Sequence, residues 1–205
     1  MRSVSSRRAS RAIAALGAAL VLSACHKSGE APAKVSVVAA GSAASRTIKS
    51  TSTARPGTGV TATVVDASGR ELGVLTLADA GAAISLGGTL RGLAPGVHGI
   101  HLHAVGACGG PDFAGAGGHW SPMPRQHGTL NPAGPHHGDL RNFTVGADSS
   151  VIVTLQTPAG SLRGEHPLLD ADGAAVVVHA AADDYVTNPS GGSGARIACG
   201  VVSGS

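Results

Sequence analysis

From Gly59 onward the chain consists mainly of short stretches in which apolar and polar residues alternate. In residues 60–64, for example, valine or alanine alternates with threonine, which places the apolar side chains on one face of a strand. Turn-forming sequences separate such stretches, as at 66–69, 79–81 and 95–96, and they recur about every 8–12 residues. No stretch of more than ten residues has clean helical periodicity, so the pattern predicts an all-β sandwich or barrel. The expected strands are 60–64, 72–77, 82–90, 100–103, 143–145, 151–156, 174–179 and 197–202.

The segment from Cys108 to Asp139 interrupts this pattern. It is rich in glycine and proline, has no alternating apolar run, and contains four of the ten histidines. A loop of this length without regular structure is uncommon inside a compact domain, and such loops usually serve a function. We therefore expect residues 108–139 to form part of a functional site.

The N-terminal residues have the features of an export signal. Four arginines in residues 2–11 precede an apolar stretch, residues 12–22, which is too short to span a bilayer. This stretch leads to Leu22-Ser23-Ala24-Cys25, which resembles a bacterial lipobox, in which the cysteine is lipidated and becomes the first mature residue. Ordinary cleavage after Ala24, without a lipid, is the alternative.

Composition changes again after the signal. Residues 26–58 are rich in alanine, serine, threonine, glycine and proline and show little periodicity, which is typical of a flexible tether. The sequence therefore predicts three parts. They are a lipoprotein signal peptide in residues 1–24, the lipid-anchor cysteine and tether in 25–58, and a folded domain in 59–205.

Charge and aromatic content argue against a nucleic-acid-binding protein. The chain has 15 basic and 12 acidic residues, a net charge of +3, but four of the basic residues lie in the export signal. From Arg55 onward 7 basic residues stand against 11 acidic ones, a net charge of −4. The phenylalanine, tryptophan and tyrosine residues number only four, too few for a base-stacking surface.

Nine histidines lie between residues 98 and 179, and several are spaced as metal ligands. His101 and His103 are two residues apart on an expected strand, so their side chains share one face and can hold one metal ion. His179 ends another expected strand and can bring a third imidazole. Three imidazoles and one carboxylate suit a tetrahedral zinc site. The long loop offers His119, His127, His136 and Asp139.

Six short segments, in this order, resemble the copper/zinc superoxide dismutase family. They are HGIHLH at 98–103, GHW at 118–120, QHG at 126–128, HHGD at 136–139, VH at 178–179 and ARIACG at 195–200. The resemblance extends over about residues 60–202 and, with the lipobox, is greatest to the exported bacterial lipoprotein type. It implies an all-β Greek-key β-sandwich or flattened barrel with long metal-binding loops.

The resemblance also implies two adjoining metal sites. His119 would bridge copper and zinc, and it would take part in catalysis. The other copper ligands implied are His101, His103 and His179, and the other zinc ligands are His127, His136 and Asp139.

Further roles follow from the same resemblance. Asp183 would link a ligand of each metal, and Arg196 would lie beside copper as a catalytic residue. Cys108 and Cys199 would form a disulfide, and His98 would support the site without binding a metal. Residues 184–195 contain no lysine or arginine, although family members often place basic residues there, so attraction of the anionic substrate would depend on Arg196, with Arg125 as a second contributor.

The implied activity is dismutation of superoxide to dioxygen and hydrogen peroxide, with copper and zinc as cofactors. The alternative is a non-catalytic copper- or zinc-binding module on the same fold. We expect an exported protein, periplasmic or at the cell surface, that contacts the membrane only through its lipid anchor and binds no nucleic acid. The sequence leaves monomer and homodimer open.

Overall fold

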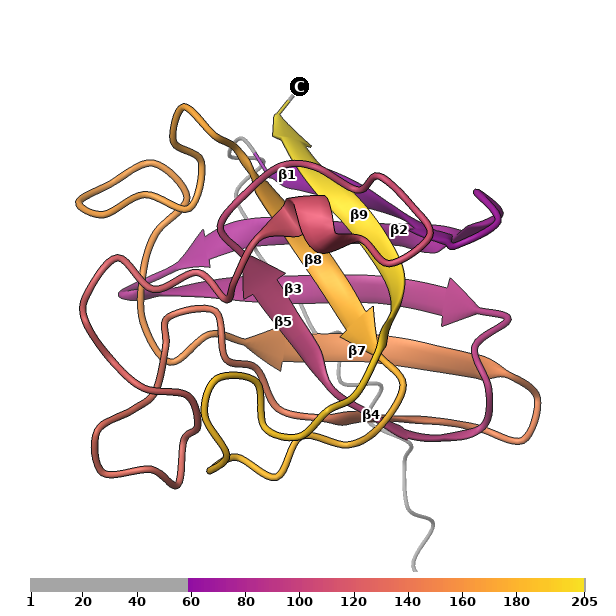
Figure 1. Ribbon diagram of the computed structural model, residues 1–205. Helices are drawn as coiled ribbons and strands as arrows, with labels where there is room; N and C mark the ends of the chain where they lie inside the picture. Colours follow the sequence, from indigo (N-terminus) through magenta and orange to yellow (C-terminus); the bar gives the residue numbers. More distant parts are fainter. Residues whose placement is uncertain (1–58, 205) are drawn as a thin grey trace, which may run out of the picture. The chain divides into compact units, whose positions relative to one another are not determined.

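The computed structural model describes residues 59–204, in which the regular secondary structure is nine β-strands and one short 3-10 helix (Figure 1). The expected signal peptide, the lipidated Cys25 and the tether lie outside the described residues. No helix in residues 59–204 is long and apolar enough to cross a membrane. The strands are β1 (Val60–Asp66), β2 (Glu71–Ala80), β3 (Ala83–Arg91), β4 (Gly96–His98), β5 (Ile100–His103), β6 (Phe143–Val145), β7 (Ser150–Gln156), β8 (Ala174–His179) and β9 (Arg196–Gly204).

Seven of these strands form one antiparallel sheet in the order β5-β8-β9-β1-β2-β3-β7, and β4 pairs with β6 in a small second sheet. Neighbouring strands β1, β2 and β3 follow one another along the chain, whereas the connections from β3 to β5 and from β7 to β8 cross from one side of the sheet to the other. In Figure 1 the strands β5, β8 and β9 run steeply across β2, β3 and β7, so the sheet curls on itself. The predicted all-β sandwich or flattened barrel is confirmed.

Alternation of apolar and polar residues produces the core. In β1 the side chains of Val60, Ala62 and Val64 are buried, while the threonines between them are exposed. Ala62 pairs with Leu75 of β2 and with Val202 of β9, both of which are buried as well. The sheet therefore curls around its own apolar face.

Two details of the sequence prediction were wrong. Residues 95–96 were expected to form a turn, but Gly96 begins β4, whose three residues are too few to show an alternating pattern. The turn expected at 79–81 falls at Gly81 and Ala82, because β2 and β3 stay paired as far as Ala80 and Ala83. Gly81 has a φ of 70°, which glycine adopts without strain and which allows the chain to reverse in two residues.

The long loop contains one short 3-10 helix, η1 (Ala114–Ala116), and no strand among residues 108–139. It is nevertheless fixed to the sheet by isolated bridges, which pair His101 with Asp139 and His103 with His119. Gly138 lies against β5, where a Cβ atom would be 2.2 Å from the carbonyl oxygen of Leu102. Only glycine fits at this contact, which brings the loop histidines next to those of the strand.

Candidate metal centre

Strands β5 and β8 and the long loop bring histidines together into two adjoining groups. In each group, one potential ligand atom per residue lies within 4.8 Å of all the others. His119 belongs to both. The first group is His101, His103, His119 and His179, and the second is His119, His127, His136 and Asp139.

In the first group, four buried ring nitrogens have no hydrogen-bond partner within the described residues. Their other ring nitrogens have partners, which determine where each ring carries its proton. His103 and His179 donate to backbone carbonyl oxygens at 2.9 and 3.2 Å, and His101 Nε2 donates to Asp183 Oδ2 at 2.7 Å. The free lone pairs therefore face one another, which fits a bound cation. The four unpartnered atoms are His101 Nδ1, His103 Nε2, His119 Nε2 and His179 Nε2.

Burial keeps these rings neutral. Desolvation lowers the pKa of His101 to about 3 and that of His179 to about 4. It also lowers the pKa values of His103 and His119. A neutral imidazole is the form that binds a metal, so the first group is ready for a soft or borderline ion at neutral pH.

The second group surrounds the carboxylate of Asp139. Its Oδ1 lies 2.9, 3.0 and 3.3 Å from the Nδ1 atoms of His119, His127 and His136. Its Oδ2 accepts the backbone N–H groups of Gly128 and His136 at 2.8 and 3.0 Å. Burial opposes the negative charge, but these hydrogen bonds outweigh it and hold the pKa of Asp139 below its usual range.

His127 shows that this region favours a positive charge. Burial opposes protonation of the ring, but hydrogen bonds to Asp139 and Asp183 outweigh it and raise the pKa of His127 to about 9. A metal cation bound by Asp139 and by Nδ1 of His127 would take the place of the proton on Nδ1, while Nε2 would keep its proton for Asp183. Three imidazoles and one carboxylate are also the donor set that zinc accepts.

Asp183 joins the two groups. Its Oδ2 accepts from His101 of the first group, and its Oδ1 lies 2.9 Å from Nε2 of His127 in the second. Asn142 holds Asp183 through two hydrogen bonds with its backbone, at 2.8 and 2.9 Å. The sequence analysis missed Asn142, because it lies just before β6 in an unremarkable polar stretch and 41 residues from its partner.

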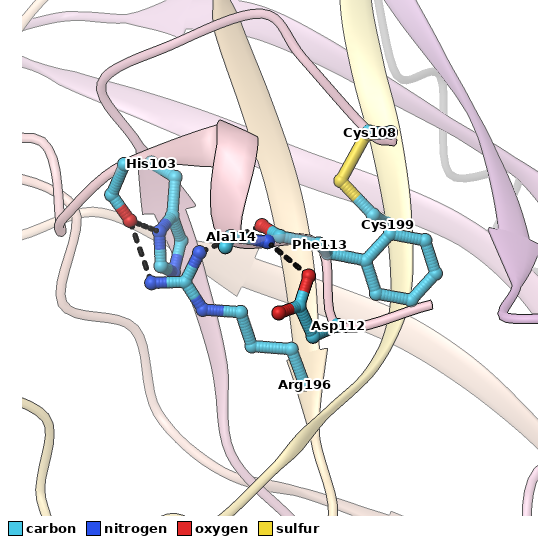
Figure 2. Close-up of a disulfide and its surroundings, with 8 residues drawn as sticks. His103, Cys108, Asp112, Phe113, Ala114, Arg196 and Cys199 are labelled. Atoms are coloured by element: carbon cyan, nitrogen blue, oxygen red, sulfur yellow. Dashed lines mark hydrogen bonds between the residues drawn. A yellow bond between two sulfur atoms is a disulfide. The ribbon is translucent and has the colours of Figure 1, made fainter. Parts of the chain in front are cut away.

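Arg196 is positioned by the long loop, as Figure 2 shows. Its Nη1 donates to the carbonyl oxygen of Phe113 at 2.8 Å, and its Nη2 donates to that of Gly117 at 2.6 Å. The Gly117 oxygen also accepts the ring proton of His103, so one carbonyl group contacts both the arginine and a member of the first group. Sequence analysis missed Phe113 and Gly117, whose contribution comes from backbone oxygen atoms.

The predicted disulfide between Cys108 and Cys199 is confirmed, with a Cα–Cα distance of 5.6 Å. It attaches the beginning of the long loop to β9 (Figure 2). Phe113 is only 1% exposed and packs in a small apolar cluster with Cys199 of β9 and Val177 of β8. The covalent bond and the buried ring together hold the loop that orients Arg196.

A hollow of about 360 Å³ opens over the first group. Its lining includes His103, His119, His179 and Arg196, so a small molecule can reach these side chains from solvent.

Three further histidines among residues 59–204 belong to neither metal group. His98 is buried and contacts the carbonyl oxygens of His179 and Ala94, and within residues 59–204 it belongs to neither metal group. His137 and His166 also lie outside both groups.

Comparison with known proteins agrees with this geometry. Residues 72–202 match the family described as copper/zinc superoxide dismutase (SODC). The chain is 43% identical over 146 residues to superoxide dismutase [Cu-Zn] of Caulobacter vibrioides, and the aligned region covers 69% of this chain and 84% of the relative. It is 32% identical over 139 residues to extracellular superoxide dismutase [Cu-Zn] of Haemonchus contortus, and the aligned region covers 65% of this chain and 74% of that relative.

Two solved structures are also similar. The SOD-like protein from Bacillus subtilis is 40% identical, with a TM-score of 0.66 and coverage of 70% of this chain and 97% of that one. The Cu/Zn superoxide dismutase from Brucella abortus is 30% identical, with a TM-score of 0.57 and coverage of 71% and 99%, respectively.

Proposed function

The chain belongs to the copper/zinc superoxide dismutase family, and from that premise we propose which of its residues hold the metals, transfer protons and bind the substrate during dismutation. The protein converts superoxide to dioxygen and hydrogen peroxide, with copper and zinc as cofactors. The observation that carries the assignment of residues is the set of four unpartnered, buried imidazole nitrogens facing one another beside a second group that contains a carboxylate.

In this proposal His101, His103, His119 and His179 hold copper through their unpartnered nitrogens. Imidazole ligands without hard oxygen donors suit both Cu(II) and Cu(I). The outer nitrogens of His101, His103 and His179 are held by Asp183 or by backbone carbonyls, so these rings stay in one tautomer and one orientation.

The second group would hold zinc through His119, His127, His136 and Asp139. Zinc has no redox role. Its site would instead fix the long loop, because three of its ligands lie between residues 127 and 139. His119 would use Nδ1 on the zinc side and Nε2 on the copper side. Asp183 would fix the position of one site relative to the other, because it contacts a histidine of each group.

The chemistry that copper supplies when bound is the acceptance of one electron from a first superoxide and its return to a second. Overall, two superoxide anions and two protons become one dioxygen and one hydrogen peroxide. Nε2 of His119 can bind either copper or a proton; when it is not bound to copper, it would hold one of the protons and deliver it to the forming peroxide, while Nδ1 keeps the ring in place. Arg196 would attract the anion into the hollow and orient it, since this residue lines the hollow.

A non-catalytic metal-binding module would need neither an arginine nor an open approach to the histidines. Both are present here, because Arg196 and His179 line the same hollow. We therefore favour the enzyme over the metal-binding module.

For localisation, we propose that the chain is exported, to the periplasm or the cell surface, and anchored through a lipid on Cys25. The disulfide supports export, because disulfides persist in oxidising compartments. The charged and apolar segments before Cys25 support a signal peptide. Contact with the membrane would be through the lipid alone. Measurement of the molar mass in solution distinguishes a monomer from a homodimer.

The residue assignment is tested by metal content and superoxide decay. Purified protein loaded with both metals should contain about one copper and one zinc per chain. His179→Ala should lose copper and activity but keep zinc and the native circular dichroism spectrum. His166→Ala, a histidine outside both groups, is the matched control and should retain both metals and full activity. Loss of zinc alone in His179→Ala would overturn the assignment.

A further inference from the structure

A second hollow adjoins the one over the copper group. Its volume is about 690 Å³, and the two hollows share Gly118, Gly194 and Arg196. The second hollow is also lined by Asp112. Histidines aside, Arg196 and Asp112 are the only charged residues among the described residues that line these two hollows. An anion that approaches the copper group therefore meets one positive and one negative side chain.

The loop holds Asp112 in place beside Arg196. The Asp112 carboxylate accepts the backbone N–H of Ala114 at 3.1 Å, at the start of η1. The next residue, Phe113, is buried and has a φ of 53°, a left-handed conformation that fixes the direction of the chain here. Figure 2 shows the Asp112 side chain on the same side of the loop as Arg196.

The two side chains act on each other through space. Both terminal nitrogens of Arg196 donate to backbone carbonyls rather than to Asp112. Burial lowers the pKa of Arg196, and the charge of Asp112 opposes that change, so the carboxylate is close enough to be felt at the guanidinium. The field of Asp112 therefore subtracts from the field that Arg196 offers an anion.

We propose that the negative charge of Asp112, at the entrance to the copper site, lowers the rate at which the site captures superoxide. Its carboxylate repels the anionic substrate and partly cancels the attraction of Arg196. This inference rests on the proposed function, because it takes an anion arriving at Arg196 as the substrate. It predicts that removal of a charged side chain next to the active site makes the enzyme faster.

The direct test compares Asp112→Asn with the wild type in the full-length, metal-loaded protein. Asparagine keeps an oxygen for the Ala114 N–H, so the loop is preserved while the charge is lost. We expect kcat/KM for superoxide to rise about two- to fivefold at low ionic strength, where charges act over about 30 Å. The gain should largely disappear near 1 M salt, where the screening length is about 3 Å.

Asp148→Asn is the matched control. Asp148 is exposed, and its Oδ1 likewise accepts a backbone N–H two residues ahead, from Ser150 at 3.1 Å. It lines neither hollow. The control changes the net charge of the protein by the same amount, so equal gains in both variants would show an effect of overall charge and overturn the proposal.

Binding of azide, a small anion, to the copper(II)-loaded protein provides a readout that does not depend on turnover. Its dissociation constant should fall about two- to fivefold in Asp112→Asn and stay unchanged in Asp148→Asn. Unchanged rate and azide affinity in Asp112→Asn, with an active wild type, would refute the role of Asp112. An inactive wild type with both metals bound would instead refute the proposed function.

Discussion

Removal of the disulfide should cost the protein a large part of its stability. The bond joins Cys108 to Cys199 across 91 residues. The chain-entropy estimate for a loop of this size is about 4.6 kcal/mol at 25 °C, with strain in the folded state reducing it. Domains are typically stable by about 5–15 kcal/mol, so the unbridged chain should be close to unfolding when metals are removed.

Cys108→Ser is the better variant for this measurement. Cys108 is only half-buried, whereas Cys199 is fully buried, and a serine there would leave an unsatisfied hydroxyl group in the core. The assay is urea unfolding of the metal-free protein, followed by circular dichroism. We expect a loss of about 3–5 kcal/mol in the free energy of unfolding. Activity of the metal-loaded variant should also fall, because the loop that orients Arg196 is no longer attached to β9.

Treatment with dithiothreitol separates the bond from the substitution. Reduction should destabilise the wild type by the same amount and leave Cys108→Ser unchanged. A loss below about 1 kcal/mol in both cases would show that packing around Phe113 holds the loop without the disulfide, and the entropic reasoning would fail.

Three further predictions concern the metals, the substrate and the anchor. Asp139→Ala should lower zinc retention far more than copper retention, measured by elemental analysis after dialysis, and an equal loss of both would contradict the assignment. Arg196→Lys should keep part of the activity and Arg196→Glu should lose most of it, about tenfold or more at low salt, with metal content unchanged. Cys25→Ser should abolish labelling by a radioactive fatty acid in cells. An unlabelled wild type would exclude the lipid anchor.

Local sequence pattern was sufficient for most of the strands. The bounds of β5, β6 and β8 agree with the expected ranges. In β6 burial of one face requires apolar residues at a spacing of two, and in fully buried β8 they occupy every position; β5 is also fully buried, and its apolar residues alternate with His101 and His103. β4 was missed because three residues cannot show a period. The chemistry of the site was also visible locally in His101 and His103, whose spacing on a strand puts both rings on one face.

The division of the other ligands between two sites did not follow from spacing. It came from a family resemblance, and the structure brings the corresponding side chains together. The sequence thus showed which residue types are present and in what order, whereas the distances between their side chains depended on the fold. Histidine and aspartate are candidates wherever they occur, and only folding puts His101 and His127 on the two oxygens of one carboxylate.

Residues that act through the backbone or through space were decided by the tertiary structure alone. Phe113 and Gly117 hold Arg196 with carbonyl oxygens, which every residue possesses and no pattern can reveal. Asn142 meets Asp183 across 41 residues, and Asp112, near the beginning of the long loop, lines the same hollow as Arg196. Each of these contacts depends on the sheet order that places β5, β8 and β9 side by side, and that order is set by long-range packing rather than by local sequence.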